Sequence, residues 1–319
     1  MGDRPAVSVI MPAYNLANYI VEAVESVRAQ TFADFELIIV DDGSTDGTLQ
    51  CLNRFQDDPR IRVLPEPHRG MPLPVCRGIE LAQAPYVAFL DGDDLWAPRK
   101  LERHVEFFET HPGVDLTFSW SRIVDEHGRD TGLTSRLWRG PLSFSQLLAD
   151  NVVGNGSALM VRREALLAAG GVDSSLPCCH DVDFWLRVAL LRPGNLYAIP
   201  EFLTFYRRRP GQLTRNVELM EQNFERVLDR ARTLAPSEVA RVEKKARCNM
   251  QRFFAYGSYQ NSDYPAALRF LRRSFSAAPI GFLADVRNWK MTAAALAGLA
   301  LPRSWHNFLV QTVLRSRRV

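Results

Sequence analysis

The sequence predicts an α/β fold: a Rossmann-like mixed, mainly parallel sheet flanked by helices, with an α-helical C-terminal extension. Three observations lead to this prediction. Short β-branched apolar runs alternate with amphipathic segments of helical period over the first 110 residues. Acidic residues directly follow two of these runs. Beyond about residue 216 the strand pattern disappears and helical periods dominate.

The first part of the chain repeats one strand-and-helix unit. Strands are predicted at residues 7–11, 35–40, 61–64 and 86–90, and helices at 17–29, 46–55, 72–83 and 98–110. This alternation implies parallel strands joined by right-handed crossovers, with helices on both faces of the sheet. The loops that follow the strands then gather along one edge, where open α/β sheets bind their ligands.

The pattern is less regular from residue 114 onward. Strands are predicted at 116–121 and 157–161, and helices at 144–149, 163–169 and 182–191. This part is interpreted as an extension of the sheet that carries long substrate loops. Three further helices are predicted at 216–234, 237–256 and 266–278.

The net charge of +3 conceals two parts of opposite sign. Residues 1–206 carry 18 basic and 28 acidic side chains, whereas residues 207–319 carry 21 and 8. The basic part predicts an anionic partner, such as a membrane surface or a phosphorylated carrier. No nucleic-acid-binding motif accompanies the charge, so we expect no nucleic-acid partner.

The cysteines and the N-terminus predict a cytoplasmic location. The five cysteines include an adjacent pair but no CxxC, which favours neither a disulfide framework nor a zinc site. The N-terminal residues lack a long apolar stretch after a basic start, which argues against a secretory signal. The basic C-terminal helices predict peripheral contact with the inner face of the cell membrane.

Residues 293–301 form a short apolar stretch near the C-terminus. Nine residues cannot cross a bilayer, because a spanning helix needs about 20. Trp289, Lys290, Arg303 and Trp305 flank the stretch and would suit a helix that lies at a membrane interface. A buried core helix with a solvated basic end is the alternative.

The segment VAFLDGDDLW, residues 87–96, ends an apolar run in Asp91, Asp93 and Asp94. Three carboxylates within four residues repel one another, and a cation among them would relieve that repulsion. All-oxygen ligands suit Mg²⁺ or Mn²⁺, and substrate phosphates commonly fill the remaining coordination positions. The segment therefore predicts a metal-dependent nucleotide site. Taken alone, an acidic segment of this kind is more often a solvated turn that caps a strand and opens the helix after Pro98.

A second acidic cluster follows another predicted strand and supports the interpretation as a binding site. The segment FELIIVDDGSTDGT, residues 35–48, ends a strand in Asp41 and Asp42 and continues into a turn through Gly43 and Ser44. A carboxylate at a strand end can accept hydrogen bonds from a nucleobase imide or a ribose hydroxyl. Residues 13–15, 41–44 and 91–94 are thus all expected at one edge of the sheet.

With these segments in place, the chain resembles the family 2 glycosyltransferases of the GT-A fold. Five blocks carry the resemblance, in the family's order and spacing. They are VSVIMPAYN at 7–15, QTFADFELIIVDDGSTDGT at 30–48, YVAFLDGDDLW at 86–96, NGSALMVRREALLAAGGVD at 155–173 and HDVDFWLRV at 180–188. Together they extend over roughly the first 190 residues.

The resemblance implies a role for each matching residue. Asp42 is expected to contact the nucleobase and Asp91 the ribose, Asp93 shares a metal with Asp94, and Asp181 stands at the position of the catalytic base. The residues implied in nucleotide-sugar binding are Pro12, Ala13, Tyr14, Asn15, Asp41, Asp42, Asp91 and Gly92. By the same resemblance, residues 1–112 are the donor-binding half, 113–212 the acceptor-binding half and 213–319 the basic helical extension.

The chain also departs from the family pattern. His180 replaces the usual Glu before the base, and we expect it, with Trp96, to orient the base or contact the acceptor. A family Arg-Asn pair appears as Val75 and Cys76, so diphosphate or base contacts are expected from Arg69 or Arg77 instead. Trp185 is interpreted as core packing.

The sequence therefore predicts an inverting hexosyltransferase. Its donor is a nucleotide sugar, with UDP expected, and its acceptor is a hydroxyl of a glycan or of a lipid-linked oligosaccharide. A base must take the acceptor proton, and Mg²⁺ or Mn²⁺ would offset charge on the diphosphate. The alternatives are transfer to polyprenyl phosphate, a nucleotidyltransferase, which the missing GxxxxGK loop disfavours, and a non-catalytic scaffold.

Overall fold

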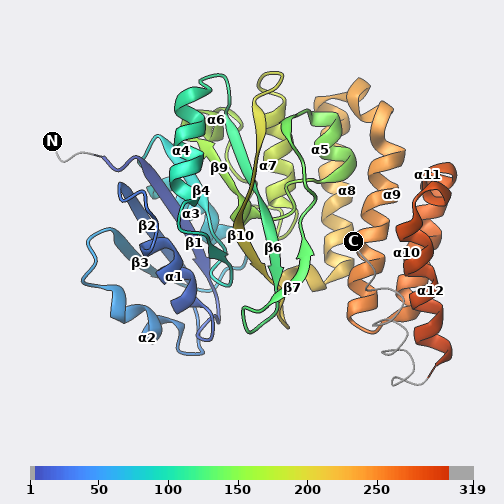
Figure 1. Cartoon of the computed structure of the whole chain (residues 1–319), viewed down its shortest axis with the longest axis horizontal. Helices are drawn as coiled ribbons and strands as arrows, with labels where there is room; N and C mark the ends of the chain where they lie inside the picture. Colours follow the sequence, from blue (N-terminus) through green and yellow to red (C-terminus); the bar gives the residue numbers. More distant parts are fainter. Residues whose placement is uncertain (1–3, 302–319) are drawn as a thin grey trace. The chain divides into compact units, whose positions relative to one another are not determined.

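The computed structural model describes residues 4–301, and these form two compact units (Figure 1). The first holds residues 4–144 and 152–210, and the second holds residues 145–151 and 211–301. The change of unit falls after Pro210, and residues 145–151, which lie within the expected acceptor-binding half, belong to the second unit.

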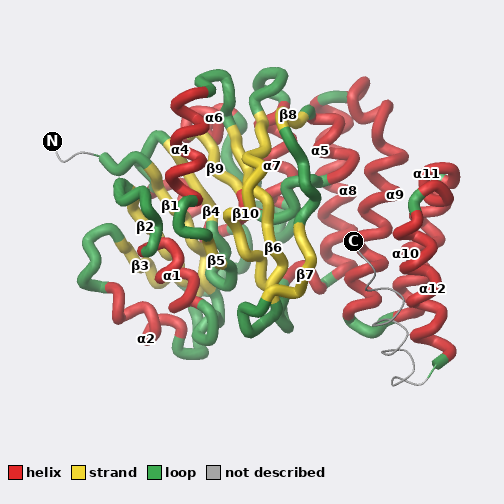
Figure 2. The backbone as a smooth tube through the Cα atoms, in the orientation of Figure 1, coloured by secondary structure: helices red, strands yellow, loops and turns green. Residues whose placement is uncertain are grey.

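The first unit is built on a ten-stranded sheet (Figure 2). Eight strands follow the order β3, β2, β1, β4, β9, β6, β10, β5, while β7 pairs with β6 and β8 with β10. The strands are β1 (Val7–Ala13), β2 (Phe35–Asp42), β3 (Ile61–Glu66), β4 (Tyr86–Phe89), β5 (Leu95–Trp96), β6 (Leu116–Val124), β7 (Asp130–Thr134), β8 (Gly140–Leu142), β9 (Leu159–Arg162) and β10 (Leu196–Arg207).

The strand directions divide this sheet into a parallel part and a mixed part. Strands β1 to β4 are parallel, as the alternating pattern predicts, and β6 and β10 are parallel to each other. Strand β9 lies antiparallel between β4 and β6. The predicted mixed sheet flanked by helices is therefore confirmed.

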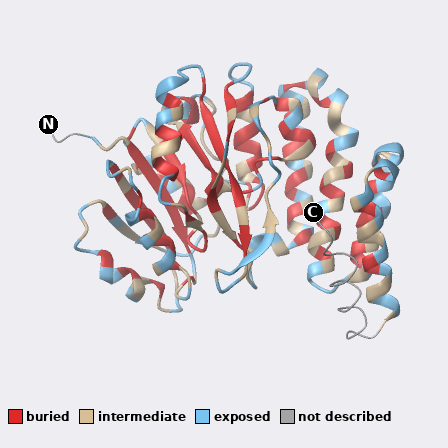
Figure 3. Ribbon diagram, in the orientation of Figure 1, coloured by how far each residue is buried: buried red, intermediate tan, exposed pale blue. Residues whose placement is uncertain are grey.

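Helices cover both faces of the sheet, and this explains why β1 is buried along its whole length (Figure 3). The side chains of Val7, Val9 and Met11 join one apolar cluster with α1 (Ile20–Arg28) and α4 (Lys100–Thr110). Ile10, on the opposite face, packs against α3 (Leu73–Leu81). The remaining helices of this unit are α2 (Thr48–Leu52), α6 (Arg163–Ala168) and α7 (His180–Ala189).

Strand β10 has no counterpart among the predicted strands. Pro200 interrupts its sequence, and proline inside a run of this kind argues against a strand. The structure accommodates the proline by shifts of register against β6 between Ile199 and Phe202 and between Phe202 and Thr204. Beyond this irregularity, β10 runs antiparallel to β5, which directly follows the acidic segment 91–94.

The second unit is helical. It contains α8 (Val217–Leu234), α9 (Pro236–Gln260) and α10 (Tyr264–Ala277), which confirms the three predicted helices, together with α5 (Phe144–Asp150), α11 (Pro279–Ala284) and α12 (Val286–Ala300). Phe254 is fully buried and packs against Phe224 and Phe270, with ring centroids 6.4 and 5.7 Å away. The rings thus join α8, α9 and α10 in one core.

The apolar stretch 293–301 lies mostly within α12 and is two-sided. Ala294 and Ala295 are buried, whereas Leu296 and Leu299 are about half exposed. The helix therefore packs through Ala294 and Ala295 and exposes Leu296 and Leu299. Arg303 and Trp305 lie outside the described residues. Among residues 4–301, none of the helices combines the length and the apolar character that crossing a bilayer requires.

We predict that Gly78→Ala destabilises the protein, although alanine is the better helix former by about 1 kcal/mol. A Cβ at this position would lie 2.4 Å from Ile10 Cγ2, in a buried contact between α3 and β1. Overpacking of this kind costs about 1–3 kcal/mol, so a net loss is expected in urea unfolding. Gly113→Ala is the control, because nothing lies within 4 Å of its added Cβ. An equal effect of both substitutions would contradict the packing described for α3.

Candidate active site

Strand β2 ends in two buried carboxylates, Asp41 and Asp42. Asp42 accepts hydrogen bonds from the backbone N–H groups of Arg69 at 2.8 Å and Gly70 at 2.9 Å. His68 Nδ1 also lies 2.9 Å from its Oδ2. Asp42 therefore fixes the loop that follows β3. Arg69 contributes its backbone to this arrangement, and its side chain is exposed.

Asp41 holds the turn that follows β2. Its Oδ2 accepts the backbone N–H of Ser44 at 3.0 Å. Its Oδ1 is buried and has no hydrogen-bond partner among the described residues. Buried carboxylate oxygens without donors are costly, so this atom adds to the negative potential at the end of β2.

The loop after β1 is bonded to this turn. Asn15 adopts a left-handed φ of 52°, its backbone N–H donates to Ser44 Oγ at 2.9 Å, and its Oδ1 accepts from Thr45 N–H at 2.8 Å. Leu16 N–H donates to Thr48 Oγ1 at 2.8 Å. These bonds unite the loops after β1 and β2, as the sequence patterns at 13–15 and 41–44 suggested.

Tyr14 supplies an exposed aromatic surface at this edge. Its ring stacks on the imidazole of His68, with centroids 4.1 Å apart and an interplanar angle of 21°. Pro12 and Ala13, in contrast, are buried within β1. The end of β1 therefore offers one exposed aromatic side chain rather than a series of polar side chains.

The acidic segment after β4 lies against the same end of β1. A Cβ on Gly92 would lie 3.1 Å from the Pro12 carbonyl oxygen and less than 3 Å from Leu16 and Ile20 side-chain carbons. Glycine is thus required for the close approach of the two loops. The backbone N–H of Asp91 donates to Ser157 Oγ at 3.0 Å, which fixes the start of the segment.

Asp94 is directed into the protein. It is fully buried, its Oδ2 accepts from Ser157 Oγ at 2.6 Å, and its Oδ1 accepts the backbone N–H of Arg207 at 2.8 Å. Burial, with the charges of Asp93 and Asp91, raises the pKa of Asp94 well above its usual range. Its contacts join the acidic segment to the turn that precedes β9 and to the end of β10.

Asp93 is paired with a cation from the loop that follows β10. Arg209 Nε lies 2.6 Å from Asp93 Oδ2. Arg207 Nε donates to the Asp93 backbone carbonyl at 2.7 Å, and its Nη2 lies 2.7 Å from Glu22 Oε2 on α1. The arginines thus bring positive charge to the acidic segment.

Asp181 is placed by the start of α7. The helix begins at His180, earlier than the predicted start at 182, and Cys179 precedes it with a left-handed φ of 58°. Asp181 therefore lies in the first turn, where the helix dipole favours a carboxylate. His180 Nδ1 is buried without a hydrogen-bond partner among the described residues, and burial lowers the pKa of this imidazole.

The carboxylate of Asp91 interacts with those of Asp93 and Asp181. Burial raises the pKa of Asp91 to about 7, and the charges of Asp93 and Asp181 contribute to the rise. The positive charge of Arg209 opposes them. The end of β4 and the start of α7 therefore share one electrostatic site, and the contacts of β1 place the end of β2 beside it.

The donor atoms at this site fit a hard divalent cation. They are carboxylate oxygens, and Mg²⁺ commonly uses one or two of these together with substrate phosphates. No group of three or more His, Cys, Asp or Glu side chains arranged to hold a metal is found within residues 4–301.

Three other residues named from the sequence have mainly structural contacts. Arg77 is exposed and forms ion pairs with Glu66 at 3.3 Å and Glu80 at 3.0 Å. Trp96 is buried, and its indole N–H donates to the Ser157 carbonyl at 2.9 Å. Trp185 is fully buried, as expected for core packing.

Ser157, Arg207 and Arg209 are contacts of the acidic segment that sequence reasoning missed. Ser157 lies in the matching block at 155–173, and its neighbours gave no reason to single it out. The two arginines belong to the run YRRRP at 206–210, three consecutive basic residues before a proline. That run is the signal that could have identified them.

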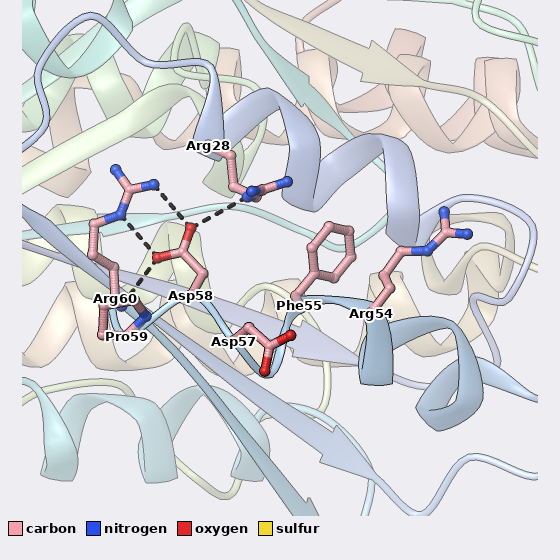
Figure 4. A pocket seen from close by; sticks show the side chains of 7 residues that line it. All are labelled: Arg28, Arg54, Phe55, Asp57, Asp58, Pro59 and Arg60. Carbon is pink, nitrogen blue, oxygen red and sulfur yellow. Dashed lines mark hydrogen bonds and ion pairs between the residues drawn. The ribbon is translucent and has the colours of Figure 1, made fainter.

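A separate hollow of about 460 Å³ lies at the opposite edge of the sheet, before the start of β3 (Figure 4). It is lined by Arg28, Arg54, Phe55, Asp57, Asp58, Pro59 and Arg60. Asp58 lies 3.2 Å from Arg28 Nε and 2.9 Å from Arg60 Nη2, so its charge is compensated. The strand ends that carry the acidic clusters do not reach this hollow.

Comparison with solved structures supports the fold. S. aureus TarS 1–349 in complex with UDP-GlcNAc superposes with a TM-score of 0.62 at 20% identity, covering 92% of this chain and 87% of that chain. The mannosyltransferase PcManGT from Pyrobaculum calidifontis, in complex with GDP-Man and Mn²⁺, gives 0.60 at 19% identity, covering 96% and 84%. Both show the fold that the sequence predicts.

Comparison of sequences shows the family. TuaG of Bacillus subtilis strain 168, named provisionally as a teichuronic acid biosynthesis glycosyltransferase, is 46% identical over 219 residues, which cover 67% of this chain and 83% of TuaG. An uncharacterized glycosyltransferase of Nostoc is 36% identical over 170 residues, and the match spans only 52% of its length. The family model for Glycosyl transferase family 2 matches residues 8–168. The chain belongs to glycosyl transferase family 2.

Proposed function

We propose that the protein is an inverting, metal-dependent glycosyltransferase that moves a sugar from a nucleotide sugar, a UDP-sugar in the first instance, to an acceptor hydroxyl. One observation carries the proposal: the charge of Asp181 acts on Asp91, within the segment that also holds Asp93. A base and a diphosphate-binding acidic segment at one site are what this reaction requires.

The donor base is assigned to the edge formed by β1 and β2. The exposed ring of Tyr14 can stack on a nucleobase, since base stacking on aromatic rings is favourable and tolerant of sequence. Asp42 has lone pairs beyond those used by the 68–70 loop, because a carboxylate offers about four acceptor sites. An imide N–H of uracil would fit such an acceptor. The Arg69 side chain, exposed beside it, is proposed to contact the diphosphate.

The reacting end of the donor is assigned to the acidic segment. Asp91 is proposed to accept hydrogen bonds from the ribose, and Asp93 to hold the cation. A cation bound there would offset the negative charge that develops on the departing diphosphate. Asp94 is proposed to hold the acidic segment in position, because its two oxygens already accept hydrogen bonds from Ser157 and Arg207.

Asp181 is proposed as the base. Its carboxylate takes the proton of the acceptor hydroxyl while the hydroxyl oxygen forms a bond to the anomeric carbon. The bond from that carbon to the diphosphate oxygen breaks, and its electron pair leaves with the nucleoside diphosphate. Attack from the face opposite the leaving group inverts the anomeric configuration. His180, uncharged because burial lowers its pKa, is proposed to orient the base or the acceptor.

The acceptor is proposed to be a glycan or a lipid-linked oligosaccharide near the inner face of the cell membrane. Residues 207–319 carry 21 basic and 8 acidic side chains, which favours an anionic surface. The exposed Trp289, Leu296 and Leu299 of α12 offer apolar groups of the kind that enter a membrane interface.

We predict that Asp181→Asn lowers turnover by about 10²- to 10⁴-fold, because an amide cannot accept the hydroxyl proton. Donor affinity should change little, since the residues assigned to the donor remain. Turnover is measured by nucleoside diphosphate release, donor affinity by calorimetry, and the product's anomeric configuration by NMR. Asp57→Asn, at the opposite edge of the sheet, is the matched control. Full turnover of Asp181→Asn would exclude its role as the base and favour a phosphate acceptor.

We also predict that the contribution of Asp91 to the stability of the metal-free protein decreases as the pH rises from about 4 to about 7. The pKa of Asp91 is raised to about 7, against about 3.9 in an unfolded chain. Within this window the native state therefore holds a proton that the unfolded state has lost. The contribution of Asp91 to the free energy of unfolding decreases by up to about 4 kcal/mol as the pH rises. Asp91→Asn should flatten the dependence in denaturant unfolding at several pH values. An unchanged slope in this variant would contradict the electrostatics described for the site.

A further inference from the structure

The ion pair between Arg209 and Asp93 is the starting observation. The two side chains are 17% and 10% exposed, and Arg209 Nε lies 2.6 Å from Asp93 Oδ2. A charge-assisted hydrogen bond of this length in a largely buried setting is strong. Asp93 is also the residue assigned to the cation. The guanidinium therefore occupies an oxygen that a divalent cation would need.

Arg207, two residues earlier, is fixed in place by several hydrogen bonds. Its side chain is 1% exposed and donates to the backbone carbonyls of Asp93 and Glu126 and to Glu22. It is also the last residue of β10, and its backbone N–H is bonded to Asp94. Removing it from this position would leave several buried groups without partners.

Arg209 belongs to a loop rather than to the sheet. It lies beyond the end of β10, just before Pro210 and before Gly211, which has a left-handed φ of 77°. Its guanidinium contacts the face of Tyr19, with Cζ 5.3 Å from the ring centroid, and Arg207 contacts the same ring at 5.2 Å. A side chain on a loop can move without breaking the sheet.

We propose that Arg209 acts as an internal counter-cation of the donor site. It neutralises Asp93 when the site is empty, competes with the divalent cation for that carboxylate, and transfers to the donor diphosphate when donor and cation bind together. Arginine suits this exchange because its planar fork matches both carboxylate and phosphate oxygens. Cation binding and donor binding thereby become coupled. The inference rests on the proposed metal-dependent function.

The test compares Mn²⁺ binding to the wild type and to Arg209 variants in the absence of nucleotide. The EPR signal of the free ion measures how much Mn²⁺ remains unbound. Arg209→Gln should bind Mn²⁺ at least tenfold more tightly than wild type, which corresponds to about 1.4 kcal/mol, because both a competitor and a repelling charge are removed. The same variant, saturated with Mn²⁺, should bind UDP at least fivefold more weakly in calorimetry. Arg209→Lys should lie between wild type and Arg209→Gln in both measurements.

Two controls make the result specific. Arg54→Gln removes the same charge from the opposite edge of the sheet, where Arg54 is directed away from the Arg28, Asp58 and Arg60 cluster (Figure 4), and should leave Mn²⁺ affinity unchanged. Asp93→Asn in the Arg209→Gln background should abolish the gain. Circular dichroism checks folding, and Arg209→Lys preserves the ion pair if the glutamine variant unfolds.

Each outcome has a definite meaning. Unchanged or weaker Mn²⁺ binding in both Arg209 variants overturns the inference, and so does a gain that persists without Asp93. A gain in Mn²⁺ affinity with no loss in UDP affinity overturns the transfer to the diphosphate. If these binding results are as expected but no nucleotide sugar is turned over, the inference about Arg209 stands and the proposed reaction is wrong.

Discussion

The compensation of negative charge at one edge of the sheet is the constraint on which the rest of this site depends. Strand β2 ends in Asp41 and Asp42, the segment after β4 adds Asp91, Asp93 and Asp94, and α7 adds Asp181. Four of these carboxylates, those of Asp41, Asp42, Asp93 and Asp94, are buried, and buried carboxylates so close to one another are unstable without donors or cations. Backbone N–H groups, Ser157 and the arginines at the end of β10 supply these in the absence of substrate.

This constraint gives a reason for the irregular path of β10. The strand must pair with β6 in parallel and still deliver Arg207 to the acidic segment after β4. The register shifts around Pro200 and Phe202 allow both. The short strand β5 then pairs with β10 directly after Asp94, so the acidic segment is held at both of its ends. The contacts of β5 and β10 therefore both stabilise the sheet and position the acidic segment for binding.

The sequence was sufficient for the first part of the fold because local signals there are strong. The apolar periods of β1 to β4 and the helices between them follow from alternation, and residues 41–42 and 91–94 were placed correctly at strand ends. It was insufficient for β10, because Pro200 masks the strand period and the pairing with β6 is long-range. Asp94 shows the same limit at the level of a side chain: nothing local indicates that it turns inward to Ser157 rather than outward.

The most direct test of this account is a crystal structure with UDP and Mn²⁺, with the cation located by its anomalous signal. The account predicts one strong peak within coordination distance of the Asp93 carboxylate and of the diphosphate, with uracil against Tyr14 and Asp42 and with Asp181 open towards the sugar side. A nucleotide bound away from the ends of β1, β2 and β4, or a cation that does not contact Asp93, would contradict it.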